Sequence, residues 1–180
     1  GEASALECLG VARLGMNDAA GAIDAFDRAR EIHREIGLER GVAMMTRRLG
    51  EALALDGRIA EAIDHFSEAL AFFDDRGDDY NRARILMGLA GALVKEDRPR
   101  EAGERLETAL EAATRAGALQ EQGNAHLALA RLAQRAGDPT SERTHLEEAH
   151  AVFEELGSPQ AAETQARLAE LGPDEAPGQS

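Results

Sequence analysis

Landmark residues recur at a fixed spacing of 40 positions along this chain, with no insertion between them. They are Leu9, Leu49, Leu89 and Leu129, then Ala29, Ala69, Ala109 and Ala149, then Gly37, Gly77, Gly117 and Gly157. A strict period of this length indicates one supersecondary unit stacked on copies of itself. The sequence therefore predicts a solenoid of four units, rather than a globule folded around one enclosed pocket.

The composition favours closely packed helices. Hydrophobic residues make up 43% of the 180-residue chain, but it has no tryptophan, one tyrosine and five phenylalanines, and alanine supplies much of the apolar content. A β-sandwich would need more β-branched and aromatic residues. Strand-like alternation and Asn-Gly hairpin signals are both missing from the sequence. The predicted fold class is therefore all-α.

Each unit is predicted to form two helices separated by turn residues. In the second unit, apolar residues follow helical spacing in Leu49, Ala52 and Leu53, and turn residues stand at Asp56 and Gly57. The glycine near the end of every unit tolerates the positive φ that a helix C-terminus often needs. We predict first helices near residues 3–16, 39–56, 79–96 and 119–136, and second helices near residues 19–36, 59–76, 99–116 and 139–156.

Residues 1–171 are expected to form a single domain. The predicted repeats are residues 1–38, 39–78, 79–118 and 119–158, followed by a capping helix over residues 159–171 and a disordered tail over residues 172–180. In the capping helix we expect Ala162, Leu168 and Leu171 to face inward and Arg167 to face outward. At the other end no polar helix precedes the first repeat, although solenoid ends normally need one. This open end suggests a piece of a longer protein, or a homodimer in which a second copy covers it.

The net charge limits the classes of partner. The chain carries 34 acidic and 20 basic side chains, a formal charge of −14. Such a field repels nucleic-acid phosphates and anionic membrane surfaces, so we expect neither as a direct partner. The longest apolar stretch, residues 85–94, is about half as long as the roughly 20 residues that a membrane-spanning helix needs. A single cysteine permits no internal disulfide, which fits a cytosolic location.

The recurring residues resemble the tetratricopeptide repeat, whose signature combines Leu-Gly, a small alanine and an aromatic residue across two antiparallel helices. The first two units carry Leu9-Gly10, Ala22, Phe26 and Ala29, then Leu49-Gly50, Ala62, Phe66 and Ala69. The last two follow the pattern loosely, with Leu89-Ala90, Ala102, Leu106 and Ala109, then Leu129-Ala130, Glu142, Leu146 and Ala149. The tryptophan and terminal proline of the signature are missing, and the period is 40 instead of about 34. Repeats of this length and composition are similar to those of large bacterial transcriptional regulators.

The resemblance implies a right-handed superhelix of four helical hairpins, in which the first helices line a concave groove and the second helices form the convex back. It also implies which side chains would face a partner. The candidate partner-binding residues are Met44, Arg47, Arg84, Met87, Lys95, Asn124, Leu127, Arg131, Gln134 and Arg135. The basic and amide side chains in this set would engage an acidic or carboxylate-bearing segment, and the methionines and the leucine would take apolar side chains. The alternative is that these are ordinary solvated charges on an open helix face.

Protein or peptide binding is the leading functional expectation, as the regulatory or sensor module of a larger bacterial regulator. The alternatives are a receptor for a small signal molecule or signalling peptide in the same groove, and a purely structural spacer. Two Glu-x-x-His pairs, Glu142 with His145 and Glu147 with His150, are the only metal-like motif. Because they lie on one predicted helix and point roughly 140° apart, they cannot share a metal ion. We therefore expect no catalysis, no metal and no cofactor.

Overall fold

The computed structural model describes residues 1–172, and within them the chain forms nine helices and no strand. The helices are α1 (Glu2–Gly15), α2 (Ala19–Glu35), α3 (Glu39–Asp56), α4 (Ile59–Asp74), α5 (Asp79–Lys95), α6 (Pro99–Arg115), α7 (Leu119–Ala136), α8 (Pro139–Glu155) and α9 (Gln160–Glu170). Apart from Gly172, the predicted tail lies outside the described residues. The prediction of an all-α solenoid is confirmed. None of the described helices is long and apolar enough to cross a lipid bilayer.

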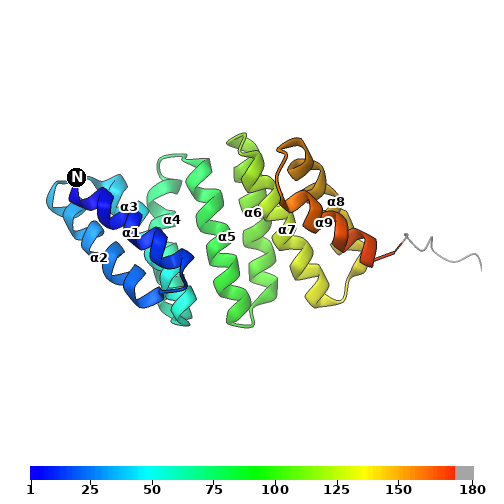
Figure 1. Ribbon diagram of the computed structural model, residues 1–180, viewed down its shortest axis with the longest axis horizontal. Helices are drawn as coiled ribbons and strands as arrows, with labels where there is room; N and C mark the ends of the chain where they lie inside the picture. Colours follow the sequence, from blue (N-terminus) through cyan, green and yellow to red (C-terminus); the bar gives the residue numbers. More distant parts are fainter. Residues whose placement is uncertain (173–180) are drawn as a thin grey trace, which may run out of the picture.

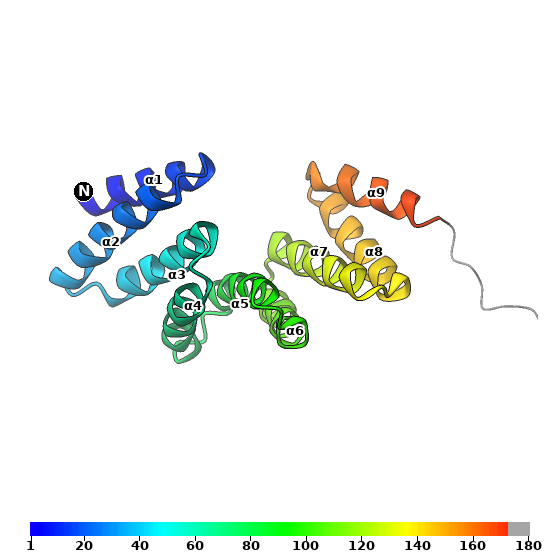
Figure 2. The same ribbon diagram turned by 90° about the horizontal axis from the view of Figure 1, so that it is seen from below.

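The helices follow one another in a row, each packed against the next (Figure 1). Seen from below, the row bends into an arc (Figure 2). Helices α3, α5 and α7 lie along the inner side of this arc, α4 and α6 lie outside them, and α1 and α9 stand at its two ends. This arrangement gives the molecule an inner face built mainly from the first helix of each repeat.

The turns between helices use a small set of residues at equivalent positions. Gly37, Gly77, Gly117 and Gly157 all have positive φ, between 61° and 70°, as the predicted helix C-termini require. At the turns inside the first and fourth repeats, Asp18 and Asp138 cap the following helix, accepting hydrogen bonds from the backbone N–H groups of Gly21 and Ser141. Regular turns of this kind keep the hairpins in register along the whole row.

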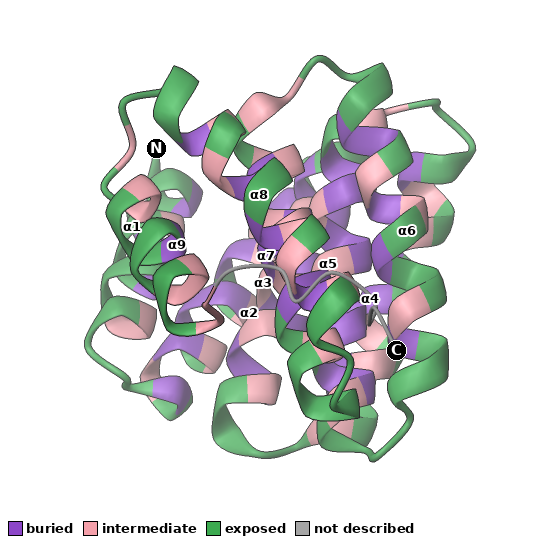
Figure 3. Ribbon diagram, turned by 90° about the vertical axis from the view of Figure 1, so that its right-hand side faces the viewer, coloured by how far each residue is buried: buried purple, intermediate pink, exposed green. Residues whose placement is uncertain are grey.

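Buried residues are concentrated where neighbouring helices meet, and the outward surfaces are mainly exposed (Figure 3). Phe66 of α4 is 1% exposed and lies between Gly50 of α3 and Gly88 of α5. A Cβ atom added to Gly50 or Gly88 would approach the ring to 2.9 or 2.7 Å, closer than packed carbon atoms come. These glycines therefore let two inner helices close onto one aromatic ring, which joins the second repeat to the third.

The last helix, α9, covers the fourth repeat in a way that differs partly from prediction. Leu168 and Leu171 pack against the core as expected, but Ala161 does so in place of Ala162, which is exposed. Arg167 does not face outward, because its Nε donates to Oε1 of the buried Glu142 at 2.8 Å. The carboxylate of Glu142 replaces the alanine that earlier repeats carry at this position, so it needs a cationic partner there.

At the first end of the row, α1 contacts α2 and leaves Leu9 and Val11 exposed, at 41% and 44%. These side chains lie on the end that we expected a second copy to cover. The homodimer stays a prediction.

Candidate functional site

A hollow of about 540 Å³ opens between α5 and α7, with Leu106 of α6 at its base. We call it the α5–α7 groove. Five of the ten predicted partner-binding residues line it: Met87, Lys95, Arg131, Gln134 and Arg135. The remaining lining residues are Ala90, Gly91, Val94, Leu106, Ala128 and Leu132. The groove thus has an apolar base and a polar rim.

The charges around the α5–α7 groove are of one sign. Its lining includes three cations, Lys95, Arg131 and Arg135, and no carboxylate, on a chain with a formal charge of −14. Lys95 donates from Nζ to the carbonyl oxygen of Ala54 near the end of α3, at 2.6 Å. Arg135 forms no ion pair with any described residue. The rim therefore offers positive charge to a ligand, in contrast to the rest of the molecule.

One small residue widens the groove on its α5 side. Gly91 occupies the position that Glu51 holds on α3 and Arg131 holds on α7. A Cβ atom added to Gly91 would meet nothing within 4 Å. Because Gly91 has no side chain, the space between α5 and the apolar base stays open, and a side chain of a ligand has room to enter.

A second hollow, of about 360 Å³, lies between α7 and α9. It shares Arg131 and Gln134 with the first and is also lined by Leu127, another predicted residue. Arg131 spans it, with Nη2 3.2 Å from Oε1 of Glu163 on α9. Both side chains are more than 60% exposed, so this pair is weak and can open for a ligand. Together we call the two hollows the inner groove.

Three of the other predicted residues lie outside the inner groove. Met44 is half-buried and packs between two core clusters. Arg84 has its Nε 3.6 Å from Glu121 and its guanidinium 5.8 Å from the ring centre of Tyr80. Asn124 accepts hydrogen bonds from Gln120 and Gln160, the latter joining α7 to α9. These polar side chains already have partners inside the chain.

Arg47 differs most from its expected place. We predicted a partner-binding residue of the groove, but the side chain is 1% exposed and pairs with Glu51, one turn further along α3. Burial lowers the pKa of Arg47 to about 10, partly offset by the charge of Glu51. Its Nε is buried without a hydrogen-bond partner among the described residues. Arg47 occupies the position of Met87 and Leu127, which line the two hollows in later repeats.

Several residues of the inner groove were not predicted. The base residues Leu106 and Leu132 carry signals of core packing only, because both follow the apolar periodicity of their helices. The contribution of α9, through Glu163 and Arg167, was missed because this helix was interpreted only as a cap. The order of the helices could have indicated this contribution, because α9 follows α7 in the row as α7 follows α5.

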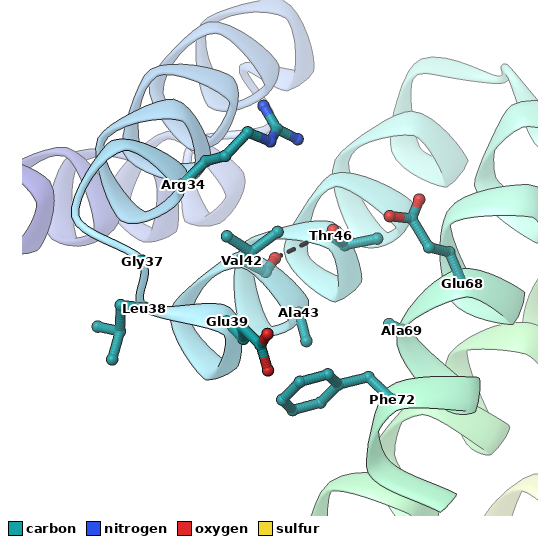
Figure 4. A pocket seen from close by; sticks show the side chains of 10 residues that line it. All are labelled: Arg34, Gly37, Leu38, Glu39, Val42, Ala43, Thr46, Glu68, Ala69 and Phe72. Carbon is teal, nitrogen blue, oxygen red and sulfur yellow. Dashed lines mark hydrogen bonds between the residues drawn. The ribbon is translucent and has the colours of Figure 1, made fainter. Parts of the chain in front are cut away.

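A third hollow, of about 600 Å³, lies on the outer side between α2 and α4 (Figure 4). Phe72 points toward Ala43 and Glu39 on α3, and Val42 lines the same space (Figure 4). Its charged residues are of mixed sign, with Arg34 on one side and Glu39 and Glu68 on the other. This outer hollow therefore has no clear electrostatic preference for a ligand. Elsewhere in the described residues, no group of three or more metal-binding side chains is placed to hold an ion.

Two stretches of the sequence, residues 1–75 and 81–155, match the family model of the tetratricopeptide repeat. The chain belongs to the tetratricopeptide repeat family. The two matched stretches correspond to the first pair and the second pair of helical hairpins. The family assignment agrees with the Leu-Gly, alanine and aromatic positions identified above, and it accounts for the close approach of Gly50 to Phe66.

Solved structures share this tetratricopeptide fold at low sequence identity. The apo form of RapI has a TM-score of 0.78 and 16% identity over 95% of this chain and 63% of its own. A Rap protein complexed with Competence and Sporulation Factor has a TM-score of 0.79 and 20% identity over 90% of this chain and 46% of its own. A putative kinesin light chain from P. anserina has a TM-score of 0.74 and 16% identity over 93% and 84%. The chain thus spans about half to two thirds of the Rap proteins, and no curated protein matches its sequence significantly.

Proposed function

We propose that this tetratricopeptide module binds a protein or peptide segment in its inner groove, and that the segment carries acidic side chains or a terminal carboxylate beside an apolar side chain. The observation that carries this proposal is the lining of the α5–α7 groove. Three cations and no carboxylate surround an apolar base on an otherwise acidic molecule. A cationic rim on an acidic protein attracts anionic segments locally while the remaining surface repels them.

Each part of the groove has a distinct role in this proposal. Arg135 and Arg131 present guanidinium groups that can hold carboxylates in a bidentate manner. Met87 and Leu106 receive an apolar side chain, and Met87 adapts its shape to what enters. Gln134 lies between the two hollows and supplies amide donors and acceptors to the backbone of an extended segment.

Charge reversal in the groove tests the proposal. We expect an acidic, leucine-containing peptide to bind the natural chain, and Arg131→Glu with Arg135→Glu to lower its affinity at least about 50-fold, since reversing each charge replaces attraction by repulsion. Fluorescence anisotropy with a labelled peptide library of graded charge measures this change. Raising the salt concentration is expected to weaken binding of the natural chain and to have little effect on the double variant.

The matched control is Arg28→Glu with Arg105→Glu, two exposed arginines on the outer helices α2 and α6. It changes the net charge by the same amount but leaves the groove intact, so peptide affinity should change less than about threefold. A second variant, Gly91→Leu, fills the groove without changing any charge and is expected to abolish binding. Equal losses in the groove and control variants, or full binding by Gly91→Leu, would refute the proposed site.

A receptor for a small signal molecule or signalling peptide is the second candidate function. The volume of the α5–α7 groove, about 540 Å³, lies within the range of small-ligand sites. The likeness to the Rap protein crystallised with Competence and Sporulation Factor also favours it. A receptor would change the curvature of the solenoid when the ligand binds, which small-angle X-ray scattering would detect as a change in radius of gyration. A scaffold would retain its partner without that change.

The cellular context belongs to the same proposal. The 40-residue repeats support a role as the sensor module of a larger bacterial transcriptional regulator in the cytosol. A DNA-binding or ATPase domain in the same polypeptide would support this assignment, and the groove would then couple partner binding to that domain.

A further inference from the structure

Two histidines lie side by side between the helices of the fourth hairpin. His126 of α7 and His145 of α8 have their Nδ1 atoms 3.3 Å apart and their ring centroids 5.5 Å apart. Both rings are only partly buried, so small solutes can reach them. The pair joins neighbouring helices, so no helical spacing in the sequence indicates it.

The separation of the two nitrogens fits a shared metal ion. Without a metal ion, one Nδ1–H donates a long hydrogen bond of 3.3 Å to the Nδ1 atom of the other ring. A tetrahedral Zn²⁺ ion with Zn–N bonds of about 2.0–2.1 Å holds two nitrogen ligands about 3.3 Å apart. The same two atoms, Nδ1 of each ring, are the ones that face each other.

The protonation of the pair also suits a metal. Burial lowers the pKa of both histidines below the ordinary value, and the charge of His145 lowers that of His126 further. Glu148 on α8 acts on both rings in the opposite direction, as does Glu107 on α6 for His145. Burial therefore favours the neutral form of both rings, which is the form that can donate a lone pair to a metal ion.

We propose that His126 and His145 bind a divalent transition metal ion, such as Zn²⁺ or Ni²⁺, through their two Nδ1 atoms and thereby link α7 to α8. No third metal-binding side chain stands in place among the described residues. Water therefore completes the coordination, together with Glu148 if its exposed side chain rotates toward the ion. Imidazole ligands favour Zn²⁺, Ni²⁺ and Cu²⁺ over Mg²⁺ and Ca²⁺, which prefer oxygen.

Isothermal titration of the full chain with Zn²⁺ at pH 7.5 tests this site. We expect one ion per chain, no heat with Mg²⁺, and at least a tenfold loss of Zn²⁺ affinity for either His126→Ala or His145→Gln. The matched control is His65→Ala. His65 occupies the position of His145 two repeats earlier, where Thr46 stands at the position of His126, so this control should bind Zn²⁺ as the natural chain does.

Two further readouts separate a bound metal from a structural effect. Zn²⁺ is expected to raise the unfolding temperature of the natural chain and of the His65 control, but not of the His126 or His145 variants. Zn²⁺ affinity should also fall as the pH is lowered through the pKa of the two rings, because protons then compete with the metal ion. Unchanged Zn²⁺ binding in both variants, or no binding by the natural chain, would overturn the proposal.

Discussion

Replacing Phe66 with alanine is expected to lower the free energy of unfolding by about 3–5 kcal/mol. The ring is 1% exposed and is held between Gly50 of α3 and Gly88 of α5, so its removal leaves a cavity at the junction of two repeats. Chemical denaturation followed by far-UV circular dichroism measures the loss.

The same contact predicts that Gly88→Ala changes the free energy of unfolding in opposite directions with and without the Phe66 ring. Gly88→Ala alone should destabilise the chain by about 1–3 kcal/mol, since the new Cβ atom would approach the ring to 2.7 Å. In the Phe66→Ala background the methyl group has space, and the better helix propensity of alanine should then stabilise the chain by about 0.5–1 kcal/mol. A double-mutant cycle measures this coupling.

Gly91→Ala is the matched control, because Gly91 lies on the same helix and its added Cβ atom would meet nothing within 4 Å. It should stabilise the chain by about 0.5–1 kcal/mol in either background. If Gly88→Ala behaved like Gly91→Ala in the natural chain, the packing of the repeats described above would be wrong.

Removing the counter-ion of the buried Arg47 on α3 is expected to have an effect of similar size. Glu51→Gln leaves the guanidinium of Arg47 buried without a counter-ion and should lower the free energy of unfolding by about 3–5 kcal/mol. The pKa of Arg47, lowered to about 10, corresponds to a cost of about 3 kcal/mol for keeping the group charged even with Glu51 present. Thermal and urea unfolding at pH 7 measure the loss.

Arg47→Met provides the comparison for this prediction. It removes the buried charge and places at this position the residue that α5 carries as Met87, so stability should stay the same or rise by about 1–3 kcal/mol. The Arg47→Met, Glu51→Gln double variant should be close to the single Arg47→Met variant. A large loss of stability in Arg47→Met would mean that the ion pair itself stabilises the fold.

Much of the fold could be predicted from the sequence because its determinants are local and repeated. The glycines at 37, 77, 117 and 157 mark helix ends by their backbone freedom alone, and the apolar period places Phe66 in the core. Such signals depend on neighbours within one or two turns. They do not depend on how the repeats are arranged around the superhelix.

The candidate site was harder to predict because it depends on contacts between repeats. Periodicity assigns Arg47, Met87 and Leu127 to the same helix face, but only the packing of α3 against α5 decides that Arg47 is buried. The pairing of Arg167 with Glu142 and the meeting of His126 with His145 likewise depend on how neighbouring helices are rotated. These rotations leave no trace in a single sequence.

The most direct test of the proposed function is to map a bound acidic peptide by changes in the amide signals of the isotope-labelled chain in NMR spectra. The structure predicts that the largest changes fall on the inner groove, around Gly91 on α5 and Arg131 and Arg135 on α7. Changes centred instead on Val42 and Phe72, in the outer hollow between α2 and α4, would contradict the assignment of the inner groove as the binding site.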